Sequence, residues 1–291
     1  MPRAPDPILY YAPGGGLGHM RRAAKLAQQL DFGSGWVLAA SAAPALARWL
    51  PAGAKLEIIP AELSNQPAAL REWINALLAR LAPSALYVDA FPGGLFGECC
   101  GLALPAGMET IHVARLLDWA RYAQRLTAPL PRFNRILMLE PLHHAHQQAL
   151  EAASSSIQPL ILDAPVTTDV AKPDKAAAAT TPNNAPLWLI AHSEPLDEVH
   201  DLLAYAQAAA RAEHVAPRFA VISACAGTAP GVEWHADADA IDWYPRASRL
   251  FTAAGFNTLH ETRPWRQRQH IMPMPRALDD QFERARRERQ L

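Results

Sequence analysis

The chain has 291 residues, of which 50% are hydrophobic and 19% are charged, a composition typical of globular proteins with one large or two modest domains. Its 27 lysines and arginines are balanced by 28 aspartates and glutamates, which argues against nucleic acid as a partner. No apolar run has the length of a membrane-spanning helix, and the N-terminus lacks an apolar signal segment. We therefore expect a cytoplasmic protein, and the arginine-rich residues 263–289 leave peripheral contact with the inner membrane as an alternative.

The N-terminal half alternates between predicted strands and helices. The apolar run Ile8–Ala12 predicts a strand, residues 13–18 a glycine-rich loop, and residues 20–30 a helix. Alternation of this kind is typical of βαβ units, which build a parallel sheet covered by helices. Further strands are predicted at residues 36–40, 56–59, 86–88, 110–113 and 136–139, and further helices at residues 43–50, Pro67–Leu81 and 143–153.

A change in composition divides the chain. Residues 171–186 are poor in large apolar side chains and rich in Ala, Pro and Thr, which predicts a linker or mobile loop. After it the alternation resumes, with strands at Leu187–Ala191, 218–223 and Gln269–Met272 and helices at 197–212, from near Gly255 and at 278–290. We therefore predict two α/β domains, residues 1–165 and 187–291, joined by residues 166–186.

The glycine-rich loop after the first strand is a candidate binding site. Gly14, Gly15, Gly16 and Gly18 permit positive φ angles and close approach of the backbone to a ligand. Because the loop lies between a strand and a helix, it directs backbone N–H groups and the positive helix end toward one place, which suits a phosphate. The loop lacks both the Lys-Ser/Thr pair of a P-loop and the spacing of a dinucleotide fingerprint, so a tight structural turn is the alternative.

His19 directly follows this loop, at the predicted helix start. The positive end of a helix disfavours the imidazolium form, so the ring is expected to be neutral and able to accept a proton. That property suits a general base acting on a hydroxyl nucleophile. A capping or packing histidine is the alternative.

A second glycine, Gly255, lies at a predicted strand–helix junction near the C-terminus. Asn257 and Thr258 follow just inside the helix, which gives another start suited to anions. Glu261 comes one helical turn later and is expected to face the same ligand. Its carboxylate suits ribose hydroxyls rather than a phosphate. An ordinary surface glutamate is the alternative.

A third candidate site follows a proline turn at residues 273–275. Two carboxylates and an amide stand there at the start of the last predicted helix. Asp279 and Asp280 fit the role of helix N-caps. Alternatively, Asp280 and Gln281 bind sugar hydroxyls, for which carboxylate and amide groups are well suited.

Three motifs in this order resemble a known family. They are G-G-G-L-G-H-x-x-R, which ends on Arg22, G-F-N-T-x-x-E, which starts at Gly255, and P-x-P-R-x-x-D-x-Q-x-x-R-A, which starts at Pro273. Together they resemble the GT-B fold glycosyltransferases, in the branch containing peptidoglycan N-acetylglucosaminyltransferase and monogalactosyldiacylglycerol synthase. Residues 88–99, including Asp89, resemble the acceptor-lobe segment of bacterial members.

The resemblance implies an α/β protein of two Rossmann-like domains facing a cleft, with a shortened C-terminal domain. It implies a nucleotide-sugar donor, in this branch a UDP-sugar, an acceptor hydroxyl, and His19 as the general base. No metal or cofactor is implied, because helix dipoles and hydrogen-bond donors stabilise the leaving diphosphate. Donor contacts are implied for Gly14, Gly15, Gly16, Gly18, Gly255, Asn257, Thr258, Glu261, Asp280 and Gln281.

The loop after the first C-terminal strand departs from the family pattern. Family members commonly carry a glycine pair there, whereas residues 191–195 of this chain are Ala-His-Ser-Glu-Pro. Ser193 is expected to donate a hydrogen bond to the diphosphate, but Glu194 would repel it unless turned away. Three functions therefore stay open: a glycosyltransferase, a non-catalytic binding or assembly protein of the same fold, and a sugar-nucleotide epimerase or hydrolase.

Cysteines and clustered histidines are weak signals of metal binding in this chain. Cys99 and Cys100 are adjacent and no C-x-x-C spacing occurs, so buried thiols in a reducing compartment are expected. His143, His144 and His146 fall at a predicted helix start, where we expect a solvated face rather than a metal site.

Overall fold

The computed structural model describes residues 7–14, 17–41, 50, 53–162, 185–236 and 238–290. The chain forms two compact units, the first made of Met1–Asp163 with Ala277–Asp280 and the second of Ala164–Arg276 with Gln281–Leu291. The predicted linker lies outside the described residues except at positions 185 and 186, and so does the predicted helix at 43–50 except at position 50. Residues Ala277–Asp280 fall within the predicted C-terminal domain, yet they pack with the first unit.

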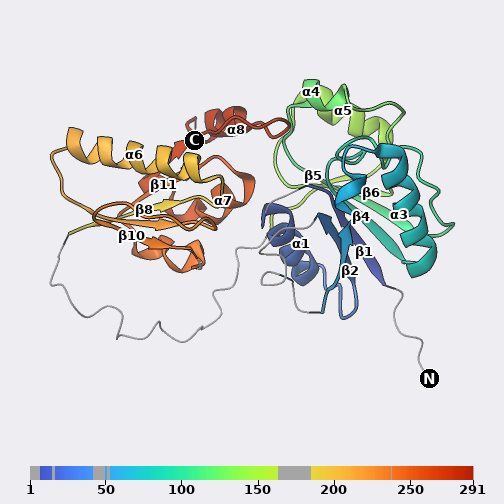
Figure 1. Ribbon diagram of the computed structural model, residues 1–291. Helices are drawn as coiled ribbons and strands as arrows, with labels where there is room; N and C mark the ends of the chain where they lie inside the picture. The colour runs from blue at the N-terminus through green and yellow to red at the C-terminus, as the bar shows by residue number, and fades with distance from the viewer. Residues whose placement is uncertain are drawn as a thin grey trace. The chain divides into compact units, whose positions relative to one another are not determined.

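The first unit is built on a parallel sheet of seven strands (Figure 1). The strand order is β3-β2-β1-β4-β5-β6-β7, and every neighbouring pair runs parallel. Helices cover both faces of such a sheet and bury its strands, so the strands are short apolar runs separated by helices. The strands are β1 (Ile8–Ala12), β2 (Val37–Ser41), β3 (Lys55–Ile59), β4 (Ala85–Ala90), β5 (Glu109–Ala114), β6 (Arg135–Met138) and β7 (Ile157–Pro159).

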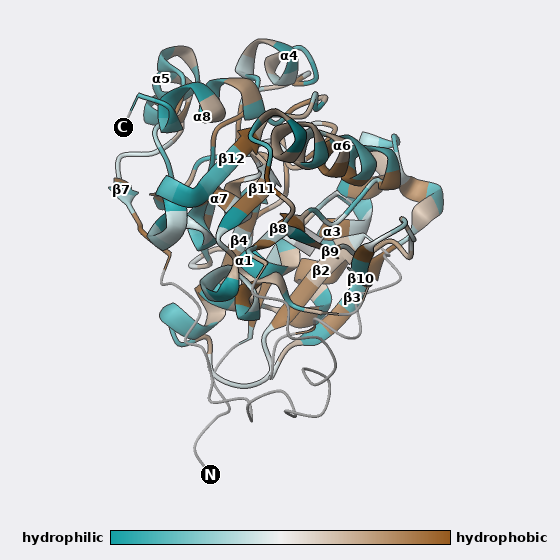
Figure 2. Cartoon of the chain, turned by 90° about the vertical axis from the view of Figure 1, so that its left-hand side faces the viewer, coloured by the Kyte–Doolittle hydropathy of each residue, from teal (hydrophilic) through white to brown (hydrophobic). Residues whose placement is uncertain are grey.

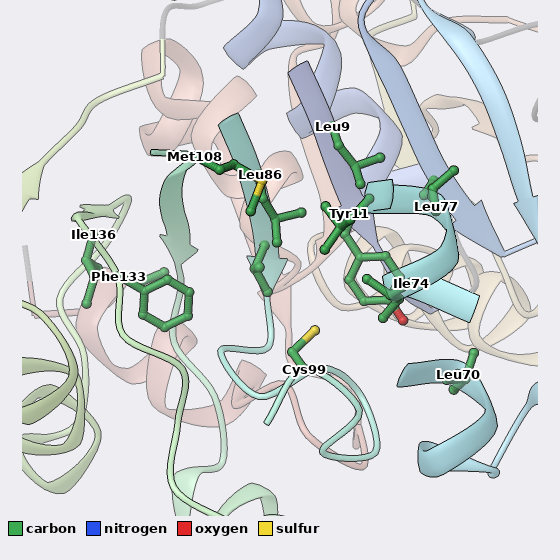
Figure 3. Close-up of a cluster of buried hydrophobic side chains, with 14 of the residues drawn as sticks. Leu9, Tyr11, Leu70, Ile74, Leu77, Leu86, Cys99, Met108, Phe133 and Ile136 are labelled. Atoms are coloured by element: carbon green, nitrogen blue, oxygen red, sulfur yellow. The ribbon is translucent and has the colours of Figure 1, made fainter. Parts of the chain in front are cut away.

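Helices cover both faces of this sheet. Figure 1 shows α1 (Leu17–Gln29) and α3 (Pro67–Leu81) on opposite sides of the strands. Successive strand residues point to opposite faces, so Leu9 and Tyr11 of β1 share one cluster with Ile74 of α3 (Figure 3). The shorter helices are η1 (Ala61–Leu63), α4 (Trp119–Ala123) and α5 (His144–Ala153).

The second unit repeats the architecture with five parallel strands, in the order β10-β9-β8-β11-β12. One face of α6 packs on the sheet, where Leu202 joins Ile190 and Phe251 in a buried cluster; Figure 2 shows brown and teal residues together on this amphipathic helix. The strands are β8 (Leu187–Ala191), β9 (Arg218–Ile222), β10 (Val232–His235), β11 (Arg249–Ala253) and β12 (Gln269–Met272). The helices are α6 (Leu196–Ala212), η3 (Ala240–Asp242), η4 (Tyr244–Arg246), α7 (Phe256–Glu261), η5 (Arg263–Arg268) and α8 (Gln281–Glu288).

Most predicted helices and strands are confirmed, and several of them have both of their predicted bounds. The strands at Ile8–Ala12, Leu187–Ala191 and Gln269–Met272 and the helix at Pro67–Leu81 have the predicted bounds. The last helix begins three residues later than predicted, at Gln281, because the preceding residues belong to the first unit. The sequence does not predict β7 and β10, which are edge strands with little buried apolar surface and therefore a weak pattern.

Several arginines of the basic C-terminal segment pair with glutamates of the same segment. Arg266 pairs with Glu288 at 2.9 Å, and Arg286 and Arg287 both pair with Glu283. Pairing of this kind is typical of a solvated helix rather than of a surface for anionic lipid. Among the described residues, no helix has both the length and the apolar character needed to cross a bilayer. Peripheral membrane contact stays a prediction.

Candidate active site

The strand order of each sheet reverses at one point, and this topology marks where ligands bind. In the first sheet the chain moves outward from β1 through β2 to β3 and then returns with β4 to the other side of β1. In the second sheet it moves from β8 through β9 to β10 and returns with β11 beside β8. Ligands of open parallel sheets bind beyond the carboxyl ends of the strands that flank such a reversal. The candidate sites are therefore the residues that follow β1, β4, β8 and β11.

His19 and Asp89 meet at the reversal point of the first sheet. His19 lies in the first turn of α1, which follows β1, and Asp89 is the penultimate residue of β4. His19 Nδ1 is 2.5 Å from Asp89 Oδ2, a carboxylate that is fully buried. Because Nδ1 faces the carboxylate, we assign the ring proton to Nδ1, which leaves Nε2 as the basic nitrogen.

Arg22 and Tyr10 complete the network around Asp89. Arg22 binds the carboxylate with two parallel hydrogen bonds, from Nε to Oδ1 at 2.6 Å and from Nη2 to Oδ2 at 2.5 Å. The Tyr10 hydroxyl donates to Oδ1 at 2.8 Å. Arg22 lies three residues after His19, so both side chains leave the same face of α1 and reach one carboxylate. The negative charge of Asp89 is thus balanced by a buried guanidinium rather than by the imidazole alone.

Burial and pairing set the protonation states of this network. Burial by itself would raise the pKa of Asp89, but the charge of Arg22 and the hydrogen bonds from His19 and Arg22 hold that pKa far below its usual range. Burial lowers the pKa of His19, and the hydrogen bond to Asp89 only partly offsets this effect. At neutral pH the pair therefore consists of an ionised carboxylate and a neutral imidazole, the state that a general base requires.

Gly14 lies against the basic nitrogen of His19. Its φ of +114° is in the region that favours glycine, and a Cβ at this position would stand 3.3 Å from His19 Nε2. Gly14 N also donates to Ser41 Oγ at 3.2 Å. Gly18 is an exposed residue of the first turn of α1, whereas Gly15 and Gly16 lie outside the described residues. Gly14 therefore lies beside His19, and the role predicted for the glycine loop in binding a phosphate stays a prediction.

The residue after Asp89 has an uncommon backbone conformation. Ala90 is buried and has a φ of +60°, a region that residues other than glycine rarely adopt and that is enriched at functional sites. The turn brings the Phe91 ring to 6.1 Å from the His19 ring, measured between centroids. Phe91 thus forms part of the wall beside the imidazole.

Glu98 holds the loop that follows this turn. It is fully buried and accepts hydrogen bonds from the Tyr11 hydroxyl at 2.8 Å, from Leu95 N at 2.9 Å and from Phe96 N at 2.7 Å. Gly94 has a φ of +82°, and a Cβ there would stand 2.3 Å from Glu98 Cδ. Glycine at this position is what allows the backbone to wrap around the carboxylate.

In the second unit, predicted donor-binding residues stand at the corresponding reversal point. Ser193 follows β8 and is exposed, and Gly255 is the N-cap of α7 after β11. Asn257 and Thr258 lie in the first turn of α7, which has six residues. Glu194 is exposed. The topology therefore brings Ser193 and the Gly255 turn to neighbouring strand ends of one sheet.

A charged network lies beside Ser193 in the same unit. His192 Nε2 is 2.7 Å from Glu198 Oε2, and Arg276 binds both oxygens of the same carboxylate. Burial lowers the pKa of His192, and the bond to Glu198 partly offsets this effect. The sequence predicts no role for these three residues.

The three remaining residues predicted to bind the donor are buried or hydrogen-bonded to other residues of the chain. Gln281 is buried, and its Oε1 accepts from Ala254 N at 3.1 Å and from Met274 N at 3.0 Å. Glu261 is also buried, with 6% of its surface exposed. Asp280 Oδ2 is 2.8 Å from His143 Nε2, and both residues belong to the first unit. The roles predicted for these residues in donor binding stay predictions, and Gln281 has in addition a clear structural role.

The histidines of α5 differ from the predicted solvated helix start. His144 is exposed, but His146 is fully buried, on the same helix face as Leu150. Its ring stacks on Trp119 with centroids 4.4 Å apart, and neither ring nitrogen has a hydrogen-bond partner within the described parts of the chain. Burial lowers the pKa of His146 to about 3. The prediction is wrong for His146 because helical periodicity turns this position toward the core. In the same described parts, no group of three His, Cys, Asp or Glu side chains is placed to hold a metal ion.

We expect the free energy of unfolding to decrease as the pH falls from 6.5 toward 4. Unfolded histidines take up protons near pH 6.5, whereas burial keeps His146 neutral down to about pH 3 and lowers the pKa of His112 to about 4. The unfolded state therefore binds more protons in this window and is favoured. The substitution His146→Phe should reduce the slope of the urea midpoint against pH, whereas His144→Phe, on the exposed face, should leave it unchanged. A wild-type slope in His146→Phe would contradict this expectation.

The sequence predicts no role for Asp89, Arg22 or Tyr10. One signal was available, since Asp89 is a charged residue inside an otherwise apolar predicted strand, and charged residues are rarely buried without a partner. Arg22 stands in the first motif, but its partner lies 67 positions away in the sequence. Only the pairing of β1 with β4 brings the two together.

The fold matches those of solved glycosyltransferases and of a UDP-GlcNAc 2-epimerase. Spinosyn forosaminyltransferase superposes with a TM-score of 0.62 at 13% identity, over 99% of this chain and 84% of that one. The glycotransferase of kitacinnamycin gives 0.61 at 15% identity, over 99% and 85%. UDP-GlcNAc 2-epimerase from Neisseria meningitidis, bound to UDP-GlcNAc, gives 0.55 at 11% identity, over 96% and 85%. No protein-family model and no curated protein matches the chain.

These similarities establish the fold. The chain has the α/β architecture of the GT-B type, with two Rossmann-like units, each built on a parallel sheet. The predicted α/β class with two Rossmann-like domains is confirmed, and the second sheet, with five strands against seven, is the smaller one.

Proposed function

We propose that the chain is a glycosyltransferase that moves a sugar from a nucleotide diphosphate donor, a UDP-sugar, to a hydroxyl acceptor. The observation that carries this proposal is the His19–Asp89 pair at the reversal point of the first sheet. A neutral imidazole whose proton is held by a carboxylate has the properties of a general base. The GT-B fold supports the same class of reaction by analogy. The resemblance of the motifs to the peptidoglycan N-acetylglucosaminyltransferase branch belongs to the same proposal.

The proposed chemistry assigns one step to each group. Nε2 of His19 takes the proton of the acceptor hydroxyl while its oxygen forms a bond to the anomeric carbon of the donor. The bond from that carbon to the diphosphate oxygen breaks, and the nucleotide diphosphate leaves. Asp89 stabilises the imidazolium that forms, and Arg22 keeps Asp89 ionised throughout. The reaction needs no metal in this proposal, so EDTA should leave the rate unchanged.

The second unit provides the donor site in this proposal, except for Asp280, which packs with the first unit. Ser193, Gly255, Asn257 and Thr258 would bind the diphosphate at the reversal point of the second sheet. Glu261 would bind the ribose, and Asp280 and Gln281 the donor sugar. Each of these assignments rests on the motifs of the sequence together with this topology.

The substitution His19→Ala should reduce donor turnover by about 10²–10⁴-fold, because the general base is lost. Binding of uridine diphosphate, measured by calorimetry, should stay unchanged, because His19 is not among the residues proposed to bind the donor. Turnover is measured as release of uridine diphosphate from UDP-glucose and UDP-N-acetylglucosamine. His144→Ala, an exposed histidine of α5, is the matched control. Absence of uridine diphosphate binding at millimolar concentration would contradict the proposed function.

Two other functions are separated by the same assay. An epimerase, suggested by the similarity to UDP-GlcNAc 2-epimerase, would convert UDP-N-acetylglucosamine to its 2-epimer or to free sugar without an acceptor, which NMR of the products detects. A non-catalytic binding protein would bind uridine diphosphate without turnover in either wild type or His19→Ala.

A further inference from the structure

An open hollow lies in the first unit. Its volume is about 350 Å³, and it is lined by Asn65, Pro67, Phe96 and Arg125. Asn65 and Pro67 follow β3, and Phe96 follows β4. In a parallel sheet the segments that follow the strands lie at the carboxyl edge. The hollow is therefore bordered by the same edge of the sheet that carries His19 and Asp89.

Arg125 gives the hollow a positive charge. Its Nη1 donates to Leu95 O at 3.3 Å, and its guanidinium stands 5.9 Å from the centroid of the Phe96 ring. Within the described parts of the chain, no carboxylate lies within ion-pair distance of Arg125, whereas Arg121 on the same segment pairs with Asp118 at 3.1 Å. A half-buried guanidinium without an acidic partner retains donors for a ligand.

The wall that carries Phe96 is held in place by its own hydrogen bonds. The buried Glu98 carboxylate accepts from Leu95 N and Phe96 N, which fixes the backbone on either side of the ring. A Cβ on Gly97 would stand 3.0 Å from Arg125 O, so the two segments are in close contact. The backbone that carries Phe96 is thus fixed on this side of the hollow.

We propose that this hollow is an acceptor subsite for a hydroxylated ring that carries a carboxylate; this inference rests on the proposed glycosyl transfer. The Phe96 and Pro67 rings supply apolar walls for the ring of the ligand. The guanidinium of Arg125 matches a carboxylate in charge and geometry, and the Asn65 amide offers both a donor and an acceptor. Phe91, whose ring is 6.1 Å from that of His19, and Phe96, which lines the hollow, belong to the same loop after Asp89, so this loop borders both places.

The test uses 4-hydroxybenzoate as the probe, with its methyl ester and phenol as partners, and measures binding to the full chain by calorimetry. The substitution Arg125→Gln should weaken binding of 4-hydroxybenzoate by about tenfold or more, because a charge-assisted hydrogen bond is lost. Phe96→Ala should weaken all three ligands. Arg121→Gln, an exposed arginine of α4, is the matched control and should bind like wild type. The methyl ester should bind wild type and Arg125→Gln equally.

Equal affinity of wild type and Arg125→Gln for 4-hydroxybenzoate would overturn the subsite, and so would absence of binding to wild type at millimolar concentration. Uridine diphosphate binding is measured on every variant, because it reports folding and the donor site independently. If uridine diphosphate binds and turns over but the carboxylate is not recognised, only the subsite fails. If the carboxylate is recognised through Arg125 but uridine diphosphate does not bind, the proposed transfer fails and the binding site stands.

Discussion

The substitution Asp89→Asn is expected to reduce both the stability and the activity of the protein. The Arg22 guanidinium is 2% exposed and would lose its ionised partner, which costs about 3–5 kcal/mol of unfolding free energy when a buried pair is broken. Donor turnover should fall by about 10²–10⁴-fold, because the amide no longer holds the Nδ1 tautomer or stabilises the imidazolium. Urea unfolding measures the first effect, and release of uridine diphosphate measures the second.

A double variant separates the two effects. In Asp89→Asn combined with Arg22→Met, both charges are removed together, and part of the lost stability should return, because no unpaired charge stays buried. Activity should not return, because His19 still lacks its carboxylate partner. As the matched control, Glu57→Gln removes a carboxylate from the partly exposed pair with Arg80, at 2.8 Å, and should change stability by no more than about 1 kcal/mol. Wild-type stability in the single variant Asp89→Asn would show that the network is not the buried ion pair described above.

The second large effect is expected for Gln281→Leu. Leucine has a similar size but leaves the N–H groups of Ala254 and Met274 without their acceptor. Each unsatisfied buried donor costs about 1–3 kcal/mol, so the second unit should lose several kcal/mol of stability. Hydrogen exchange at these two amides is the sharpest measurement, because it reports the local effect directly and does not depend on two-state unfolding of a chain with two units.

Gln281→Glu keeps an acceptor oxygen at the same place and should retain most of the protection of both amides. Gln148→Leu, on the exposed side of α5, is the control for the change in side-chain chemistry and should leave exchange unchanged. If Gln281 acts only on the donor sugar, Gln281→Leu would instead raise the KM for the donor at unchanged amide protection. That outcome would contradict the structural role.

The periodicity of the sequence was sufficient for the class of fold. Short β-branched and aliphatic runs separated by helical segments have few solutions other than a parallel sheet covered on both faces, and β1, β8, β12 and α3 have the predicted bounds. His19 and the Gly255 turn could be predicted from the sequence in the same way, because a glycine between a strand and a helix meets a local requirement of the backbone conformation. These features depend on residues that are close in the sequence.

The partners of His19 depend on residues that are far apart. Asp89 stands 70 positions from His19, and only the register of β1 with β4, which places Tyr10 beside Tyr87, brings its carboxylate to the imidazole. The same holds for His146, which the sequence predicts as solvated and which the packing of α5 buries against Trp119. Local sequence patterns determine which helices and strands form and where a glycine turn precedes a helix. Side-chain charge, burial and partnership arise only from the tertiary structure, because they depend on which strands become neighbours.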